Sequence, residues 1–368
     1  MKKLCPFFLV TLALILGVAA MSSDTGESQV YTRVNLVSDI DGVARFRDAN
    51  LVNPWGLAFG PTSPFWVADN NGNVSTLYNG RGQGFPVGSP LVVTIPAPTS
   101  ATGGTPTGLV FNGTGNFVVS ANSKSGSSLF LFSTEDGTIL GWSPTVSLTS
   151  AVIAKDNSGS GAVYKGLAIA DTSKGSFLYA TNFHAGVVEI YDKNFGLVNT
   201  FTDPSVDPNF APFGIQNIDG KLFVTFALQK LPDKHDDQAG PGNGFVDVFD
   251  TEGTMIRRFA SHGALNSPWG LALAPEGFGK FSNHLIVGNF GDGRINAFDK
   301  NGDFDAQLMD PEGNPLTING LWALRFGNGS KNGGSRDKLF FTAGIADESH
   351  GLFGFIEAGH GRECEDDD

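Results

Sequence analysis

The chain has 368 residues, a formal net charge of −13 at pH 7, and two cysteines, Cys5 and Cys364. This acidity, which no basic stretch interrupts, argues against nucleic acid and anionic lipid surfaces as partners. Cys5 lies in an N-terminal segment that we expect to be removed, so the mature chain keeps one cysteine and has neither an internal disulfide nor a cysteine-based metal cluster. The high content of glycine (49) and phenylalanine (31) favours many short strands joined by tight turns.

The first twenty residues have the pattern of an export signal. Lys2 and Lys3 precede an apolar run, Phe7–Ala20, that ends in small residues. The run is shorter than the roughly 20 apolar residues that a membrane-spanning helix needs. We therefore expect residues 1–20 to be a signal peptide and the protein to be secreted, extracellular or in a bacterial periplasm, without a stable membrane span. A signal anchor is the alternative.

A short motif recurs six times along the chain: an aromatic or small residue, then glycine, leucine and alternating apolar residues. Its central glycine or alanine serves as an anchor, and successive anchors are 52, 58, 48, 56 and 53 residues apart. Repeats of this length are typical of propeller blades. The motifs are Pro54–Phe59, Pro106–Phe111, Tyr164–Ile169, Pro212–Asn217, Pro268–Leu273 and Leu321–Phe326, with anchors Gly56, Gly108, Gly166, Gly214, Gly270 and Ala323.

Further strand-like segments follow each motif. A third strand such as Val187–Asp192 alternates apolar and polar residues, and a fourth such as Thr254–Phe259 comes after it. The sequence therefore predicts an all-β protein, a six-bladed β-propeller of four-stranded blades. The predicted second strands are Trp66–Asn70, Val118–Asn122, Leu178–Asn182, Phe223–Ala227, Leu285–Asn289 and Phe340–Gly344.

The last repeat stops after its third strand, Leu352–Ile356, while a strand-like segment, Tyr31–Val37, stands near the other end of the chain. We expect this N-terminal strand to complete the last blade and close the ring. The propeller then spans residues 31–357, and the acidic tail, residues 358–368, is expected to be disordered.

Four segments resemble a family of exported propellers that are known as conserved hypothetical proteins. The resemblance covers nearly all of residues 31–357 and implies a six-bladed fold related to NHL-repeat and TolB-like propellers. It implies no activity. The segments that carry it are Pro268–Pro275, Val287–Gly293, Gly320–Asn328 and Phe341–Ile345.

One face of the predicted ring gathers polar residues. In a propeller, the loop before each first strand and the loop between the second and third strands lie at the same end of the ring, where binding residues are often found. Asparagines after the second strand recur in four blades. They could form a ring of amide oxygens able to hold Ca²⁺, or they could cap their own turns. The residues expected on this face are Asn53, Asn70, Asn122, Asn182, His184, Asn289, Asp292, Asn319, Asp347, Glu348 and His350.

The fourth blade carries an insertion, Leu228–Gly244, that leaves the repeat on the same face. Within it, His235, Asp236 and Asp237 offer one imidazole and two carboxylates, a donor set that suits a divalent cation. The alternative is a solvated loop. The sequence has no nucleophile elbow, HExxH motif, phosphate-binding loop or catalytic cysteine motif.

Because the sequence has no recognisable set of catalytic residues, it favours a binding or scaffold module. We expect this module to act outside the cell, as a monomer, on a protein or a glycan. The alternative is a metal-dependent hydrolase or lyase of the gluconolactonase-like type, in which an axial Ca²⁺ polarises a substrate oxygen. Such enzymes resemble this chain in blade number, but they need an axial carboxylate near the start of the first strands. Those places hold Asn53, Thr105, Lys165, Phe213 and Asn319.

Overall fold

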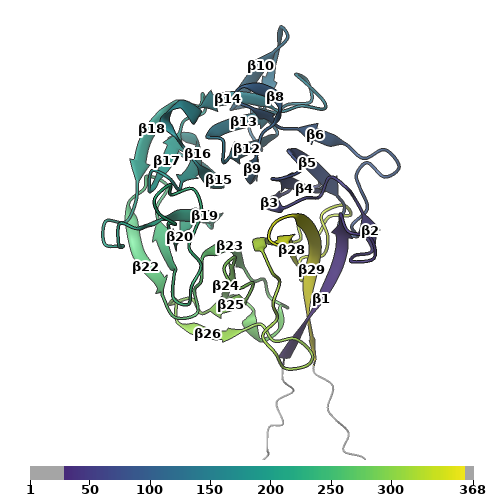
Figure 1. Cartoon of the computed structure of the whole chain (residues 1–368), viewed down its shortest axis with the longest axis vertical. Helices are drawn as coiled ribbons and strands as arrows, with labels where there is room; N and C mark the ends of the chain where they lie inside the picture. The colour runs from purple at the N-terminus through teal and green to yellow at the C-terminus, as the bar shows by residue number, and fades with distance from the viewer. Residues whose placement is uncertain (1–28, 361–368) are drawn as a thin grey trace, which may run out of the picture.

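A computed structural model of the chain describes residues 29–360, which form a ring of six blades around a central axis (Figure 1). The predicted signal peptide and residues 361–368 lie outside the described residues. The described part contains two short 3₁₀ helices, η1 (Ser158–Ser160) and η2 (Gly279–Phe281). No helix within residues 29–360 is long and apolar enough to cross a membrane. The prediction of an all-β propeller is confirmed.

Each blade contains four antiparallel strands, the first of which lies nearest the axis (Figure 1), and the sheet of blade 6 has a fifth, short strand. The strands of blades 1 and 2 are β3 (Pro54–Ala58), β4 (Phe65–Asp69), β5 (Val74–Tyr78) and β6 (Val92–Thr94), then β9 (Pro106–Phe111), β12 (Phe130–Thr134), β13 (Thr138–Trp142) and β14 (Val152–Asp156). Those of blades 3 and 4 are β15 (Tyr164–Thr172), β16 (Gly175–Asn182), β17 (Val187–Tyr191) and β18 (Leu197–Phe201), then β19 (Phe210–Ile218), β20 (Lys221–Leu228), β21 (Phe245–Phe249) and β22 (Met255–Ser261). Those of blades 5 and 6 are β23 (Pro268–Leu273), β24 (Leu285–Asn289), β25 (Ile295–Phe298) and β26 (Phe304–Gln307), then β27 (Leu321–Phe326), β28 (Leu339–Ile345), β29 (His350–His360) and β1 (Gln29–Ser38).

The two ends of the described chain close the ring, as predicted. Strand β1 pairs antiparallel with β29, and the short strand β2 (Phe46–Arg47) adds to its other edge. The pairing begins with Gln29 opposite His360. Residues 358–360 therefore belong to β29 and not to the predicted tail, because their partners at the start of β1 extend the ladder. In Figure 1, β1 (purple) and β29 (yellow) run side by side.

Blade 2 differs from the prediction. The segment Val118–Asn122 was expected to be its second strand, but β10 (Val118–Ala121) pairs with β11 (Lys124–Ser127) in a separate hairpin. The second strand is β12, which pairs with both β9 and β13. The buried pattern of β12 explains this, because all five of its residues are buried while β10 alternates between exposed and buried. A second small hairpin, β7 (Pro96–Ala97) with β8 (Ser100–Gly103), precedes the blade.

Neighbouring first strands touch at their anchor residues. A Cβ atom added to Gly56 would lie 2.4 Å from the carbonyl oxygen of Thr107 in the next blade, and one added to Gly214 would lie 2.2 Å from that of Trp269. The backbones approach each other more closely than any side chain permits. Hydroxyl groups of the second strands also connect neighbouring first strands. Thr181 Oγ1 accepts a hydrogen bond from Gly166 N and donates one of 2.8 Å to the carbonyl oxygen of Phe213 in the next blade.

We expect deletion of Tyr31–Ser38 to cause a large loss of stability or aggregation, because it removes most of β1 and exposes the long edge of β29. Tyr31 is fully buried and stacks on Phe281, with ring centroids 5.7 Å apart. Chemical denaturation with light scattering measures both effects. The exposed Arg33→Ala change serves as a control that leaves the strand in place. A truncated protein as stable as this control would contradict the closure.

The anchor contact predicts that Gly214→Val lowers the free energy of unfolding by about 1–3 kcal/mol or more, because the new side chain overpacks the axis. Gly115→Val is the matched control, since a Cβ atom there meets nothing within 4 Å. Denaturant unfolding of both variants measures the difference. Equal midpoints would show that the axis tolerates a side chain.

Candidate functional site

The insertion of blade 4 lies across one end of the ring, which we call the insertion face. Backbone hydrogen bonds give the loop its shape, including one of 2.8 Å from Lys230 N to the carbonyl oxygen of Asp236. Gln229 Nε2 donates to the carbonyl oxygen of Phe183 in blade 3, and Asn266 Oδ1, just before blade 5, accepts from Gly240 N at 2.7 Å. Because both neighbouring blades hold the loop, its side chains reach towards the axis.

A chain of polar contacts connects five blades on this face. Asn53 Nδ2 donates to Glu348 Oε2 at 2.7 Å and lies 3.5 Å from Asn70 Oδ1, and Asn70 Nδ2 donates to Glu135 Oε2 at 2.9 Å. Glu135 forms an ion pair with Lys165. From there the contacts continue into the insertion. We call these residues, together with three consecutive residues of the insertion, the axial cluster: Asn53, Asn70, Glu135, Lys165, His235, Asp236, Asp237 and Glu348.

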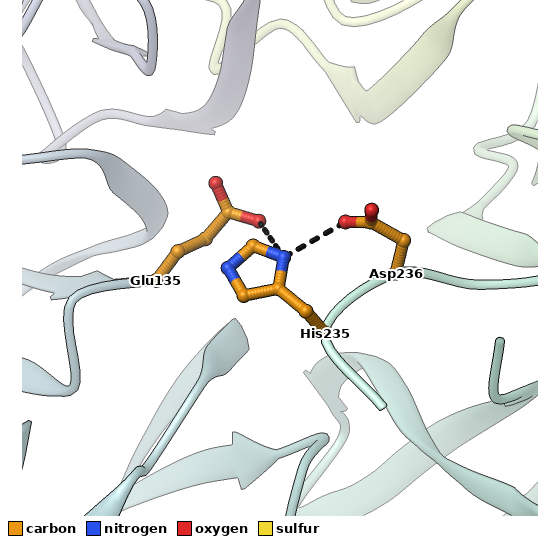
Figure 2. Close-up of side chains that lie close together, drawn as sticks. All are labelled: Glu135, His235 and Asp236. Atoms are coloured by element: carbon orange, nitrogen blue, oxygen red, sulfur yellow. Dashed lines mark hydrogen bonds and ion pairs between the residues drawn. The ribbon is translucent and has the colours of Figure 1, made fainter. Parts of the chain in front are cut away.

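The insertion contributes an imidazole and a carboxylate to the cluster. His235 Nδ1 lies 2.8 Å from Asp236 Oδ1 and 4.0 Å from Glu135 Oε1, so the ring sits between two carboxylates that come from different blades (Figure 2). Lys165 Nζ is 3.9 Å from Asp236 Oδ1. The Lys165 side chain is only 2% exposed, whereas that of Asp236 is 59% exposed. Charged groups thus run from the buried start of β15 out to the surface of the insertion.

Aromatic rings form the floor beneath these polar groups. Trp322, which is 1% exposed, stacks on Trp55 with ring centroids 3.5 Å apart and on Phe290 at 4.0 Å. Lys165 Nζ lies 5.0 Å from the ring centroid of Trp55, within range of a cation–π interaction. Trp322 Nε1 donates to Asn53 Oδ1 at 3.1 Å. The indole N–H groups of Trp55 and Trp269 are buried and have no hydrogen-bond partner among residues 29–360.

The protonation of the cluster follows from its contacts. The hydrogen bond between His235 and Asp236 raises the pKa of the imidazole above 6.5 and lowers that of the carboxyl below 3.8. Burial raises the pKa of the Asp237 and Glu348 carboxyls. One Asp237 oxygen, Oδ2, is buried without a hydrogen-bond partner in the described part of the chain.

An acidic cavity of about 410 Å³ opens beside the cluster, between the loops of blades 5 and 6. Its wall includes Asp292, Asn319, Asp347 and Glu348, together with the ring of Phe290. Glu348 belongs to both the cavity and the axial cluster. The cavity therefore continues the cluster sideways across the insertion face.

The other predicted residues have local roles. Asn182 Nδ2 donates to Glu189 Oε1 at 2.8 Å, and Asn289 Nδ2 donates to the carbonyl oxygen of Ala264 at 2.8 Å. Within residues 29–360, neither side chain forms a hydrogen bond with a residue of the axial cluster. His350 Nδ1 lies 2.6 Å from Asp39 Oδ2, and the His184 residue is exposed. Asn122 is exposed in the turn of the β10–β11 hairpin, away from the second strands, because its segment is not part of the blade sheet.

A divalent cation fits this geometry poorly. Glu135, His235 and Asp236 place one ligand atom each within 4.8 Å of one another, and Asp237 is not part of that group. The ammonium group of Lys165 already pairs with the same Glu135 oxygen that lies nearest His235. A metal ion held by these three residues would compete with Lys165 for the Glu135 carboxylate and with His235 for the Asp236 carboxylate. The metal site at His235, Asp236 and Asp237 stays a prediction.

Sequence reasoning did not single out Glu135, which joins the two halves of the cluster. It directly follows β12, as Asn70 directly follows β4, and the error in blade 2 hid that equivalence. The signal was the longest repeat spacing, 58 residues from Gly108, in which the β10–β11 hairpin is inserted. From the sequence, Lys165 was named only as a position where an axial carboxylate is missing, and its ion pair with Glu135 was not predicted.

Fold and site together define a six-bladed propeller whose insertion face carries a cluster of charged residues at the axis. Among curated proteins, the chain is 33% identical over 352 residues to Uncharacterized protein R648 of Acanthamoeba polyphaga mimivirus, covering 92% of this chain and 84% of that protein. Uncharacterized protein L690 of the same virus is 31% identical over 331 residues, with coverage of 87% and 84%. The chain belongs to the family of these mimivirus proteins. No family model matches it.

Solved structures support the architecture. A streptogramin B lyase superposes with a TM-score of 0.52 at 13% identity, covering 90% of this chain and 98% of that chain. The PQQ-bound aldose sugar dehydrogenase of Streptomyces coelicolor gives a TM-score of 0.50 at 12% identity, with coverage of 90% and 99%. At these identities the likeness concerns the fold alone.

The His235–Asp236 contact predicts a histidine that titrates above 6.5 and an Asp236→Asn variant in which that midpoint falls, because the largest cause of the raised pKa is removed. The pair stabilises the fold between the two pKa values. That contribution is lost as the pH rises through the raised pKa of His235, and also as it falls through the lowered pKa of Asp236.

NMR titration of the His235 imidazole measures this change. Asp233→Asn removes an equal charge from an exposed position of the same loop and should leave the midpoint unchanged. An unshifted midpoint in Asp236→Asn would show that the contact does not form in solution.

Proposed function

We propose that the protein is an exported binding propeller that holds a carbohydrate at the axial cluster. The supporting observation is the contact chain from Glu348 to His235, which brings hydrogen-bond donors and acceptors from five blades to one point above aromatic rings. Sugar hydroxyl groups both donate and accept hydrogen bonds, so they suit amide, ammonium and carboxylate groups in alternation. Kinship with NHL-repeat and TolB-like propellers stays a prediction.

Two features favour a glycan over a protein partner. The polar groups converge on a single point, whereas a stable protein interface needs about 800 Å² of surface on each partner. The adjoining cavity of about 410 Å³ also lies within the usual range of small-ligand pockets, roughly 300–1,000 Å³. The proposal of export rests on Lys2, Lys3 and the apolar run that follows them.

A glycan array with the purified protein, followed by calorimetry on the glycan that binds best, tests the proposal. Asp236→Asn should weaken binding about tenfold or more, equivalent to about 1.4 kcal/mol, because a carboxylate that accepts from sugar hydroxyls is lost. Asp233→Asn, on the same loop, should bind like the wild type. The proposal fails if no glycan binds above background, or if the two variants bind equally well.

The second candidate is a metal-dependent hydrolase or lyase. The observation in its favour is the grouping of Glu135, His235 and Asp236, and the observation against it is the ammonium group of Lys165 in the same place. Melting curves with and without CaCl₂ in the same experiment distinguish the two candidates. A rise in melting temperature that Asp236→Asn abolishes would favour the metal enzyme, and no rise is expected for the carbohydrate module.

A further inference from the structure

The opposite end of the ring has an opening of its own, which we call the far face. A cavity of about 280 Å³ lies there, where the first strands of five blades end. None of its residues belongs to the axial cluster. The wall combines two aromatic rings, aliphatic side chains, two amides and one guanidinium, and includes Phe59, Phe111, Leu167, Gln216, Asn217 and Arg325.

Arg325 is the charged group of this wall, and it has no counter-charge in the described part of the chain. Its Nε atom is buried without a hydrogen-bond partner, and within residues 29–360 no carboxylate oxygen lies within 4.0 Å of its guanidinium. Its Cζ atom stands 4.8 Å from the ring centroid of Phe59. Burial lowers the pKa of Arg325 to about 10, so the group stays charged at neutral pH. Arg325 is half-buried, and a charged group that is partly removed from water without a partner costs free energy.

Two other arginines in the described chain have the hydrogen-bond acceptors that Arg325 lacks there. Arg258 pairs with the carboxylates of Asp203 and Asp247. Arg257 also lies over a phenylalanine ring, that of Phe259 at 4.8 Å, but its guanidinium donates to backbone carbonyl oxygens. Arg325 likewise lies over a phenylalanine ring, that of Phe59, but no oxygen atom among residues 29–360 accepts a hydrogen bond from its Nε atom.

We infer that the far-face cavity binds a small organic carboxylate with an apolar body, held through its oxygens by Arg325. The planar guanidinium matches a carboxylate with two parallel hydrogen bonds. Phe59, Phe111 and Leu167 offer apolar contact for the rest of the molecule, and a volume of about 280 Å³ admits a small ligand. Inorganic phosphate has no apolar part and would leave those walls unfilled.

Calorimetry with sodium benzoate as the probe tests this inference. The wild type should bind benzoate and should not bind benzamide, which has the same shape without the charge. Arg325→Met should weaken benzoate binding about tenfold or more, and Arg325→Lys should fall between, because it keeps the charge and loses the planar fork. Arg257→Met is the matched control, since it removes an arginine that also lies over a ring.

Three results would overturn the inference: equal binding of benzamide and benzoate, binding of sodium phosphate but not of benzoate, or undiminished binding by Arg325→Met. If that variant does not fold, the comparison of benzoate with benzamide on the wild type still decides. Asp236→Asn should bind benzoate normally, because it changes the opposite face. Failure of the carbohydrate proposal and failure of this one are therefore separate outcomes.

Discussion

Backbone contact between neighbouring first strands at the axis is the constraint on which the rest of the molecule depends. Where Gly56 and Gly214 face the next blade, no Cβ atom fits. The residue directly before each anchor stands at the top of this contact, and in three blades it is a tryptophan whose ring packs against the others. In blade 3 the same position is Lys165. One position in the repeat therefore supplies the tryptophan rings and the lysine at the base of the axial cluster.

This arrangement explains how a lysine can be buried at the centre of a propeller. Its ammonium group lies against the Trp55 ring and pairs with a carboxylate, and both partners are fixed by blades that the axis holds in place. The insertion then adds His235 and Asp236 from above. Rigid blades supply the inner part of the cluster, and the one segment that departs from the repeat supplies its exposed part.

The fold could be predicted because the anchors repeat in sequence, and the closure because a strand was missing at one end and present at the other. The site was predicted in part: His235 and Asp236 were identified from an insertion that breaks the repeat. Glu135 was not identified, because the alternation of apolar and polar residues is a local signal that the β10–β11 hairpin also shows. The pairing of β12 with β9, which places Glu135, depends on residues far apart in the sequence. The role of an asparagine depends likewise on partners far along the chain, such as Glu135 for Asn70 and Glu189 for Asn182.

The pairing of β1 with β29 also has a mechanical consequence. Gln29 and His360 face each other at one end of the ladder, where β1 begins and β29 ends. A force that pulled Gln29 and His360 apart would break the hydrogen bonds between β1 and β29 one pair after another. It would not act on all of them at once, as a force along the strands would. The pairing that completes the ring can therefore open rung by rung under tension, although its full length resists sliding of one strand along the other.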